Sequence, residues 1–533
     1  MKPCFGRLAL SLAAGLLWFC GLMVSNDSRA TGITIITHGY DSDVNDWVTA
    51  MADRISNYPR FPGTNFTTYK VTLTTDGASY FYTVQLTNGV APAASDSGEI
   101  IVKLDWSQMA GDPDDSSIYD ISTYNVASVA SLVLLQTNSI VELGGHALAE
   151  FPIHLIGHSR GGSLMSELSR QLGTNGVWVD HLTTLDPHPL NNDGFFDPPQ
   201  VVDAPVHTYA SVLFHDNYWE NSDFYPYGES VAGAYVRYLP NLSGGYPTAH
   251  SNVHLWYHGT IDWRTPLSDT AASIGSSERL SWWASYEQAG TNAGFEYSLI
   301  GGTDRLSADR PLGAGNPAIR DGYNQLWDLG AGTSNNRTLL TTNNGGWPNL
   351  IKINRTDTNR VVQGQSASVK FFYQWARPGT SNAIVSVYLD DDLNALNNNQ
   401  KLLAQVSVPG TGPGSINSVT VSVPFFATNA SPGWHSLLAE ISGGGRTRYL
   451  YAPERVQVTP NQPPTMDIAR INSSQVRVGV DGLPTQTIIL QSSTDLFVWQ
   501  SLATNIFSST RWVYTNNVPG GSSGQFYRAM LGS

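Results

Sequence analysis

The sequence predicts an α/β domain, with a mostly parallel sheet and helices on both faces, followed by two all-β modules. From Gly32 to about Trp347, short β-branched runs alternate with segments of helical spacing, which is typical of a parallel sheet. After Trp347 the helical spacing stops and only strand patterns continue. A proline-rich stretch then precedes a last strand-rich segment. We therefore expect domains at 31–347, 348–460 and 465–533, with a linker at 461–464.

The first thirty residues have the pattern of a secretory signal. Basic residues precede an apolar run over 8–24, and Ser28-Arg29-Ala30 has the small-x-small form of a cleavage site. A membrane anchor is the alternative, but the apolar run is short for a span and polar residues follow it at once. We therefore predict a signal peptide over 1–30, no integral membrane span after cleavage, and a secreted protein that is extracellular, at the cell surface or periplasmic.

Composition excludes several kinds of chemistry. Cys4 and Cys20 are the only cysteines and both lie in the signal segment, so thiol catalysis, disulfides and cysteine-ligated metals are not expected in the mature chain. The formal net charge of −14 predicts an acidic surface that repels nucleic acid. Nucleic acid is therefore not an expected partner.

The elements of the first domain are predicted in order from periodicity. Apolar runs of strand length indicate buried strands, apolar residues at helical spacing indicate helices, and strict alternation indicates half-buried strands. The expected elements are a strand at Ile33–Thr37, a helix at Trp47–Ser56, a hairpin over Thr67–Thr87 that turns near Asp76-Gly77, a strand at Ile100–Asp105 and a mostly helical stretch over Tyr124–Ala149.

The remaining chain reads as strands. Alternating patterns over 361–374, 383–389, 418–425 and 434–441 predict an immunoglobulin-like β-sandwich, and the segment from Ile488 to Ala529 predicts a smaller β module. Such appended modules are candidates for binding glycan or cell envelope. The acidic run at 390–394 starts like a calcium loop, but Ala395 and Lys401 stand where a glycine and a bidentate glutamate are required. We expect a hairpin turn there, with calcium as the less favoured alternative, and no cofactor.

The stretch 153–162 carries the strongest chemical signal. An apolar strand runs into Gly157-His158-Ser159-Arg160-Gly161 and then into a helix, which is the pattern of a nucleophile elbow with Ser159 as the nucleophile. The same five-residue pattern recurs around Ser522, but there it follows asparagine and proline and precedes no helix, so it predicts a flexible turn.

A catalytic serine needs a base, a carboxylate that orients the base and donors for an oxyanion. Asp186 ends the next apolar segment, and Asp216, after a later strand, is the alternative acid. His250, His254 and His258 are spaced four apart, so they share one face if the segment is helical, and at least one is expected as the base. Zinc binding by the three is disfavoured, because no glutamate lies between them as in the zinc-protease helix.

The oxyanion donors are expected from backbone. The loop Thr37-His38-Gly39-Tyr40-Asp41 directly follows the first strand, which places the N–H of Tyr40 near the serine, and the N–H of Arg160 follows the nucleophile itself. The aromatic segment Tyr218–Tyr227 is a candidate roof over the site, with ordinary loop packing as the alternative.

These motifs together resemble the pancreatic and lipoprotein lipase family of α/β-hydrolases, over about 33–261. The resemblance rests on Ile35–Tyr40 with Trp47, on Leu104-Asp105-Trp106, on Gly157-His158-Ser159 and on Leu185-Asp186-Pro187. It implies an α/β-hydrolase catalytic domain. It also implies Asp186 rather than Asp216 as the acid, and His250 rather than His254 as the base, since Tyr257 and Ile261 stand at the family's offsets.

The chain also departs from that family. Arg160 replaces a leucine, so we expect its side chain to help select the substrate, and the absence of cysteines leaves no disulfide-bounded lid. The function predicted is a secreted serine hydrolase of lipase or esterase type, acting on carboxylic esters of lipids or other apolar acyl groups through an acyl-enzyme. The alternatives are a serine peptidase or amidase with the same triad, and a catalytically inert surface-binding protein.

Overall fold

The structure is a computed structural model of the full chain. It describes residues 32–55, 66–95, 98–112, 114–191, 201–221, 228–239 and 242–261, short stretches between 272 and 282, single residues at 295, 338 and 340, and 346–531 with short gaps. The predicted signal segment and Ser522 lie outside the described residues.

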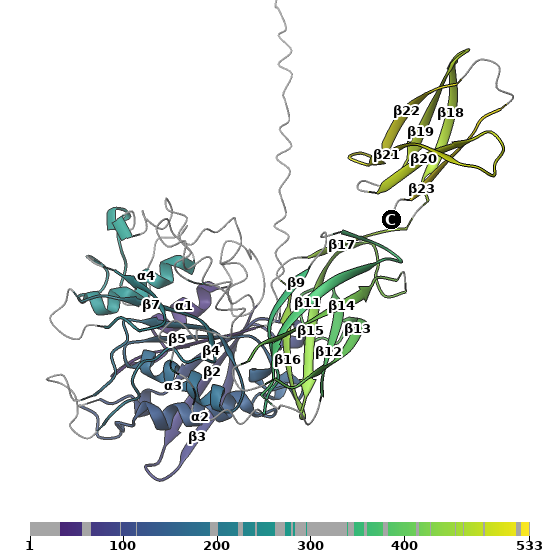
Figure 1. The fold of residues 1–533 in the computed structure, drawn as a ribbon. Helices are drawn as coiled ribbons and strands as arrows, with labels where there is room; N and C mark the ends of the chain where they lie inside the picture. The colour runs from purple at the N-terminus through teal and green to yellow at the C-terminus, as the bar shows by residue number, and fades with distance from the viewer. Residues whose placement is uncertain are drawn as a thin grey trace, which may run out of the picture.

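The first half of the chain forms an eight-stranded sheet (Figure 1). In spatial order the strands run β3-β2-β4-β1-β5-β6-β7-β8, and every neighbouring pair is parallel except β2 and β3, which form the predicted hairpin. Since parallel strands end at the same edge, the carboxyl ends of β1, β5, β6 and β7 meet there. The strands are β1 (Ile33–Thr37), β2 (Thr67–Thr75), β3 (Tyr80–Asn88), β4 (Ile100–Asp105), β5 (Ile153–His158), β6 (Val179–Leu185), β7 (Val212–Trp219) and β8 (Tyr235–Tyr238).

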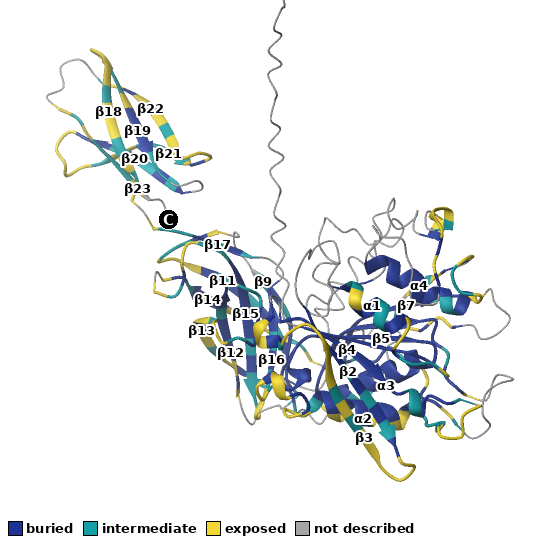
Figure 2. Ribbon diagram, turned by 180° about the vertical axis from the view of Figure 1, so that it is seen from behind, coloured by how far each residue is buried: buried dark blue, intermediate teal, exposed yellow. Residues whose placement is uncertain are grey.

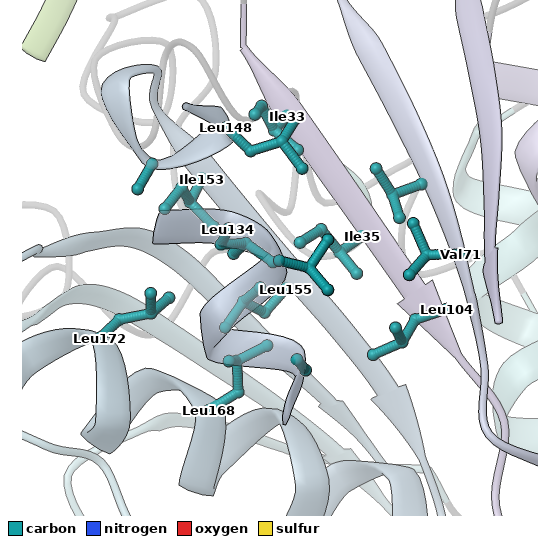
Figure 3. Packing of buried hydrophobic residues seen from close by; sticks show 14 of the residues in the cluster. Ile33, Ile35, Val71, Leu104, Leu134, Leu148, Ile153, Leu155, Leu168 and Leu172 are labelled. Carbon is teal, nitrogen blue, oxygen red and sulfur yellow. The ribbon is translucent and has the colours of Figure 1, made fainter. Parts of the chain in front are cut away.

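Two apolar clusters bury this sheet. Ile33 and Ile35 of β1 join one cluster with α2 (Thr123–Leu135) and α3 (Arg160–Thr174), and Ile36 joins another with α1 (Trp47–Ile55) and α4 (Ala249–Ile261). Figure 3 shows part of the first cluster, where Leu155 of β5 lies beside Ile35, its partner in register. Burial of the whole of β1 explains why its sequence is a continuous β-branched run.

The predicted fold class was wrong as a description of this chain. Of the described residues, 44% lie in strands and only 18% in helices, and the described C-terminal part, for which two all-β modules were predicted, contains strands. Continuous helix layers over both faces of the sheet, as predicted, are not shown: among the described residues, α1 to α4 pack against the sheet, and β6, β7 and β8 follow one another with no helix between them. The helical stretch expected over Tyr124–Ala149 ends at Leu135 and continues as two short 3₁₀ turns. Helical spacing in isolated segments overstated the amount of helix.

Residues 349–459 form two sheets around one apolar cluster. One sheet has the order β14-β11-β9, and the other has β10-β17-β15-β12-β13 with β16 paired to β15. The strands are β9 (Asn349–Arg355), β10 (Arg360–Val362), β11 (Ser366–Gln374), β12 (Asn382–Asp390), β13 (Lys401–Pro409), β14 (Asn417–Pro424), β15 (Gly433–Gly443), β16 (Arg446–Tyr451) and β17 (Val456–Thr459).

This all-β unit packs against the eight-stranded sheet unit through buried polar contacts. Arg448 of β16 places Nη2 3.0 Å from Oδ2 of Asp180 in β6, and both side chains are buried. Asn394 donates from Nδ2 to the carbonyl oxygens of Pro92 (2.8 Å) and Ser95 (3.0 Å). The acidic run at 390–394 is therefore part of a loop that contacts the N-terminal unit, which sequence reasoning did not foresee.

The last residues form two three-stranded sheets, β18-β19-β22 and β21-β20-β23, around a small core of their own. Figure 2 shows more exposed surface on these strands than on the eight-stranded sheet. In the described part of the chain, no helix has the length and apolar character needed to cross a bilayer. The strands are β18 (Thr465–Asn472), β19 (Gln475–Asp481), β20 (Thr487–Ser493), β21 (Gln500–Ile506), β22 (Arg511–Asn517) and β23 (Phe526–Leu531).

Candidate active site

Ser159 occupies a sharp turn between β5 and α3. Its backbone has φ 56° and ψ −127°, a conformation that is uncommon for any residue with a Cβ. The turn is held because the N–H of Ser159 donates to the carbonyl oxygen of Leu185 (2.9 Å) and the N–H of Gly162 donates to that of Ser159 (2.9 Å). Strain that is held in this way by the surrounding backbone is characteristic of functional sites.

The glycines around the turn allow the close approach that the turn requires. A Cβ on Gly157 would lie 2.1 Å from the carbonyl oxygen of Gly161, and one on Gly161 would lie 2.3 Å from that of His38. A Cβ on Gly39 would lie 3.1 Å from Oγ of Ser159. The loop after β1 thus touches the serine directly, at the position expected for an oxyanion loop.

Asp186 follows β6, one strand beyond Ser159, and is fully buried. Its Oδ2 lies 2.5 Å from Nδ1 of His250, and its Oδ1 accepts the N–H of Glu220 at 2.8 Å. Burial raises the pKa of the Asp186 carboxyl, and the N–H donors of Glu220 and Gly228 oppose that effect. A carboxylate held by several donors in this way fixes the orientation of the imidazole beside it.

His250 lies in the first turn of α4 and lines the same cavity as Ser159. The cavity has a volume of about 260 Å³. The contact of Nδ1 with Asp186 assigns the proton of a neutral imidazole to Nδ1, which leaves Nε2 as the basic nitrogen. The structure thus brings Ser159, Asp186 and His250, which are far apart in sequence, to one edge of the sheet.

The other two histidines of α4 have different surroundings. The ring of His254 also lines the cavity but stacks on Trp47, with ring centroids 4.3 Å apart, and burial and neighbouring histidines hold its pKa well below the usual range. Burial and Arg54 lower the pKa of His258 to about 4. Among the described residues there is no cluster of three or more potential metal ligands of the His, Cys, Asp and Glu types.

His158 is a residue whose contribution sequence reasoning missed. Its Nε2–H donates to the carbonyl oxygen of His250 at 3.0 Å, and its ring lies 4.6 Å from that of His250. Burial, and then the neighbouring His250, hold the pKa of His158 well below the usual range, so it stays neutral. His158 therefore fastens the start of α4 to the serine turn. Its place next to Ser159 in the motif was the available signal.

The backbone of Tyr40 belongs to a firmly packed loop. Two hydrogen bonds between Trp106 and His38 fix that loop. The N–H of Trp106 donates to Nε2 of His38 (3.2 Å), and Nε1–H of Trp106 donates to the carbonyl oxygen of His38 (3.2 Å). Tyr40 lines the cavity, and the N–H of Arg160 lies in the first turn of α3, where helix N–H groups have no intrahelical acceptor. Both predicted donors therefore border the serine.

The expectation that the Arg160 side chain helps select the substrate does not fit its position. The side chain is fully buried and is not part of the cavity wall. Its Nε and Nη2 donate to the two carboxylate oxygens of Asp203 at 2.7 and 2.9 Å, and it also donates to the carbonyl oxygens of Ala110 and Ile121. Arg160 is a structural cross-link beneath the site.

Asp216, the alternative acid, lies within β7 rather than at its end. It pairs in register with Thr183 of β6 and accepts hydrogen bonds from the hydroxyls of Thr183 (2.6 Å) and Tyr218 (2.9 Å), and it contacts Nε2 of His181 at 2.8 Å. These contacts place it inside the sheet, away from the edge at which Asp186 meets His250. Of the predicted aromatic roof, residues 222–227 lie outside the described residues.

Comparisons with known proteins leave the family open. No protein-family model matches the chain, and no curated protein matches it. Among solved structures, the C-terminal domain of wzt matches at 12% identity and TM-score 0.17, covering 22% of this chain and 76% of that one. The human OSCAR ligand-binding domain matches at 12% identity and TM-score 0.17, covering 34% and 93%. At these scores neither likeness bears on function.

Proposed function

We propose that this protein is a serine hydrolase that cleaves carboxylic esters through an acyl-enzyme formed on Ser159. The observation that carries the proposal is the 2.5 Å contact between Asp186 and His250 in the cavity that Ser159 lines. The order of the three residues along the chain, and the loop that follows the first strand, also agree with the sequence resemblance to the pancreatic and lipoprotein lipase family.

In the proposed reaction, Nε2 of His250 takes the hydroxyl proton of Ser159 as Oγ attacks the ester carbonyl carbon. The N–H groups of Tyr40 and Arg160 donate to the oxyanion, and His250 then gives its proton to the departing alcohol. Water, deprotonated by His250, releases the acid from the serine. Asp186 holds the imidazole in one tautomer and stabilises its protonated form.

The test is covalent labelling with a fluorophosphonate probe. We expect the purified protein to be labelled, and Ser159→Ala to lose both labelling and hydrolysis of p-nitrophenyl acetate. Ser42→Ala removes another hydroxyl from the same cavity and is the matched control, which we expect to keep the label. An unlabelled, folded wild-type protein contradicts the proposal and favours a catalytically inert surface-binding protein.

The peptidase or amidase alternative shares the triad and differs in the bond cleaved. Peptide p-nitroanilides measured beside the matching p-nitrophenyl esters separate the two. We expect the ratio of kcat/KM for the ester to kcat/KM for the anilide to exceed the ratio of their uncatalysed hydrolysis rates in buffer. We also propose secretion, guided by residues 1–30; removal of this segment is expected to abolish export when the chain is expressed in a bacterium and the medium and periplasm are assayed.

A further inference from the structure

The wall of the cavity beside Ser159 has an unusual composition for an ester site. Each described residue that lines it is a glycine, serine, aspartate, histidine or aromatic residue, and none of them carries an aliphatic side chain. Burial of a methylene group stabilises a complex by about 0.8 kcal/mol only when it is transferred into apolar surroundings. On the described part of this wall the apolar surface comes from aromatic rings, so a long flexible acyl chain finds less to bind here than on an aliphatic wall.

The volume of the cavity supports the same conclusion. At about 260 Å³, it is smaller than the roughly 300–1,000 Å³ of pockets that enclose drug-sized ligands. The side chain of Trp47, which is the largest on the wall, is 6% exposed because it is stacked on His254. We therefore expect a short acyl group to fit in the cavity, with the alcohol part of the ester toward the exposed Asp41 and Asp46.

The mouth carries negative charge. Asp41 and Asp46 are exposed and line the cavity beside the loop after β1. Burial raises the pKa of Asp41, and Asp112 and then Asp114 raise it further, so several carboxylates share this region. Like charges repel an anionic substrate on approach, and the repulsion weakens as salt is added. We therefore expect anionic esters to be poor substrates.

The same groups are suited to neutral hydroxylated molecules. Carboxylates accept two or more hydrogen bonds from hydroxyl donors, and Ser42 and Ser251 can both donate and accept. Tyr40 and Tyr246 add amphipathic rings to the wall, and such rings can pack on the apolar C–H faces of a sugar or polyol. The expected apolar acyl chain is not what this combination favours.

We propose that the site takes esters of a short acyl group, such as acetate, with an uncharged polyhydroxy alcohol of carbohydrate type. This inference rests on the proposed function, since it assigns a substrate class to the same serine. Oγ of Ser159 forms the bond to the acyl carbon as the bond to the sugar oxygen breaks, and that oxygen takes its proton from His250. Water then releases the short-chain acid, so one ester and one water give one acid and one alcohol.

The first experiment measures kcat/KM for p-nitrophenyl acetate, butyrate, octanoate and palmitate, and acetate release from glucose pentaacetate. We expect a fall of at least tenfold from acetate to octanoate, and acetate release that Ser159→Ala abolishes. An apolar site would instead gain about 10- to 200-fold for each methylene that it binds well. A rate that rises with chain length, or no acetate release from the sugar ester, overturns the substrate class while leaving ester hydrolysis intact. Failure to hydrolyse any ester overturns the proposed function instead.

The second experiment tests the charge at the mouth. Asp46→Asn keeps a residue that can cap the helix and removes one negative charge. We expect it to raise kcat/KM for an anionic ester, mono-p-nitrophenyl succinate, several-fold at low salt, with the gain shrinking at 0.5 M salt. Asp53→Asn, on the exposed side of α1, makes the same charge change away from the cavity and is the control. Equal effects of the two variants contradict the proposal.

Discussion

Arg160 and Asp203 form a two-point ion pair in which both side chains are completely buried, with Nε–Oδ2 at 2.7 Å and Nη2–Oδ1 at 2.9 Å. Asp203 also accepts hydrogen bonds from the N–H groups of Thr123 (2.9 Å) and Leu190 (3.0 Å), so both of its carboxylate oxygens accept more than one hydrogen bond. Because Arg160 directly follows Ser159, this pair ties the serine turn to α2 and to the chain around residue 203. A pair placed in this way controls stability and geometry.

Replacing Arg160 with methionine leaves Asp203 buried without its cation. Loss of one partner of a buried pair costs about 3–5 kcal/mol, so we expect a lower free energy of unfolding by that amount, measured in urea. The ratio of kcat/KM for acetate and butyrate esters should stay within twofold of the wild-type ratio. The double variant Arg160→Met with Asp203→Asn should recover part of the stability. A changed ester ratio in a stable variant would restore a role for Arg160 in substrate selection.

His250 and His254 are one turn apart on α4 and should respond differently to substitution. His250→Ala removes the base that Asp186 orients, and we expect kcat to fall by about 10⁴-fold or more with little change in melting temperature. His254→Gln disturbs the stack on Trp47, so we expect a lower melting temperature and a loss in kcat of less than tenfold. Activity that survives His250→Ala but not His254→Gln would reverse the assignment.

The Arg448–Asp180 pair joins the all-β unit to the eight-stranded sheet unit. Burial raises the pKa of Asp180 to about 6, although Arg448 opposes this, and removal of Arg448 raises it further. A carboxyl whose pKa is raised in the folded state binds more protons there than in the unfolded state. Its ionisation therefore lowers the free energy of unfolding as pH rises through that pKa. We expect Arg448→Met to cost about 3–5 kcal/mol at pH 7.5 and less at pH 5.

The control for that experiment is Asp180→Asn combined with Arg448→Met. The amide oxygen can still accept the N–H of Ile153, which now donates to Asp180 at 2.8 Å, and no charge is left buried. We expect the double variant to lose the pH dependence and to recover most of the stability in urea denaturation. Equal losses for Arg448→Met at both pH values would show that packing, rather than the charge of Asp180, dominates this interface.

His258 predicts sensitivity to acid. Its pKa is lowered to about 4 by burial and by Arg54, against an ordinary value near 6.5. Between these two pKa values the imidazole is protonated in the unfolded chain and neutral in the folded chain. The contribution of His258 to the free energy of unfolding is therefore lost as pH falls below 6.5. Between pH 7 and pH 5 we expect a loss of about 2 kcal/mol from this residue. His258→Asn should flatten the stability profile over that range; an unchanged profile would mean that His258 titrates normally.

The sequence alone determined the local features of this protein. The β-branched run at Ile33–Thr37, the helix predicted at Trp47–Ser56 and the hairpin over Thr67–Thr87 are all present, because each follows from a short-range period of apolar residues. The role of the glycines near Ser159 could also be predicted from the sequence, because the backbones in such a turn lie too close together to leave space for a Cβ.

The tertiary structure decided what periodicity could not. Helical spacing predicted helices on both faces of a mostly parallel sheet and a mostly helical stretch over Tyr124–Ala149, whereas the helix ends at Leu135 and strands outnumber helices among the described residues. Only three-dimensional proximity shows that His250 meets Asp186 and that Asp216 is enclosed within the sheet. Arg160, read from its place beside the nucleophile as a substrate contact, is drawn into the interior instead, since a buried carboxylate 43 residues later is its partner.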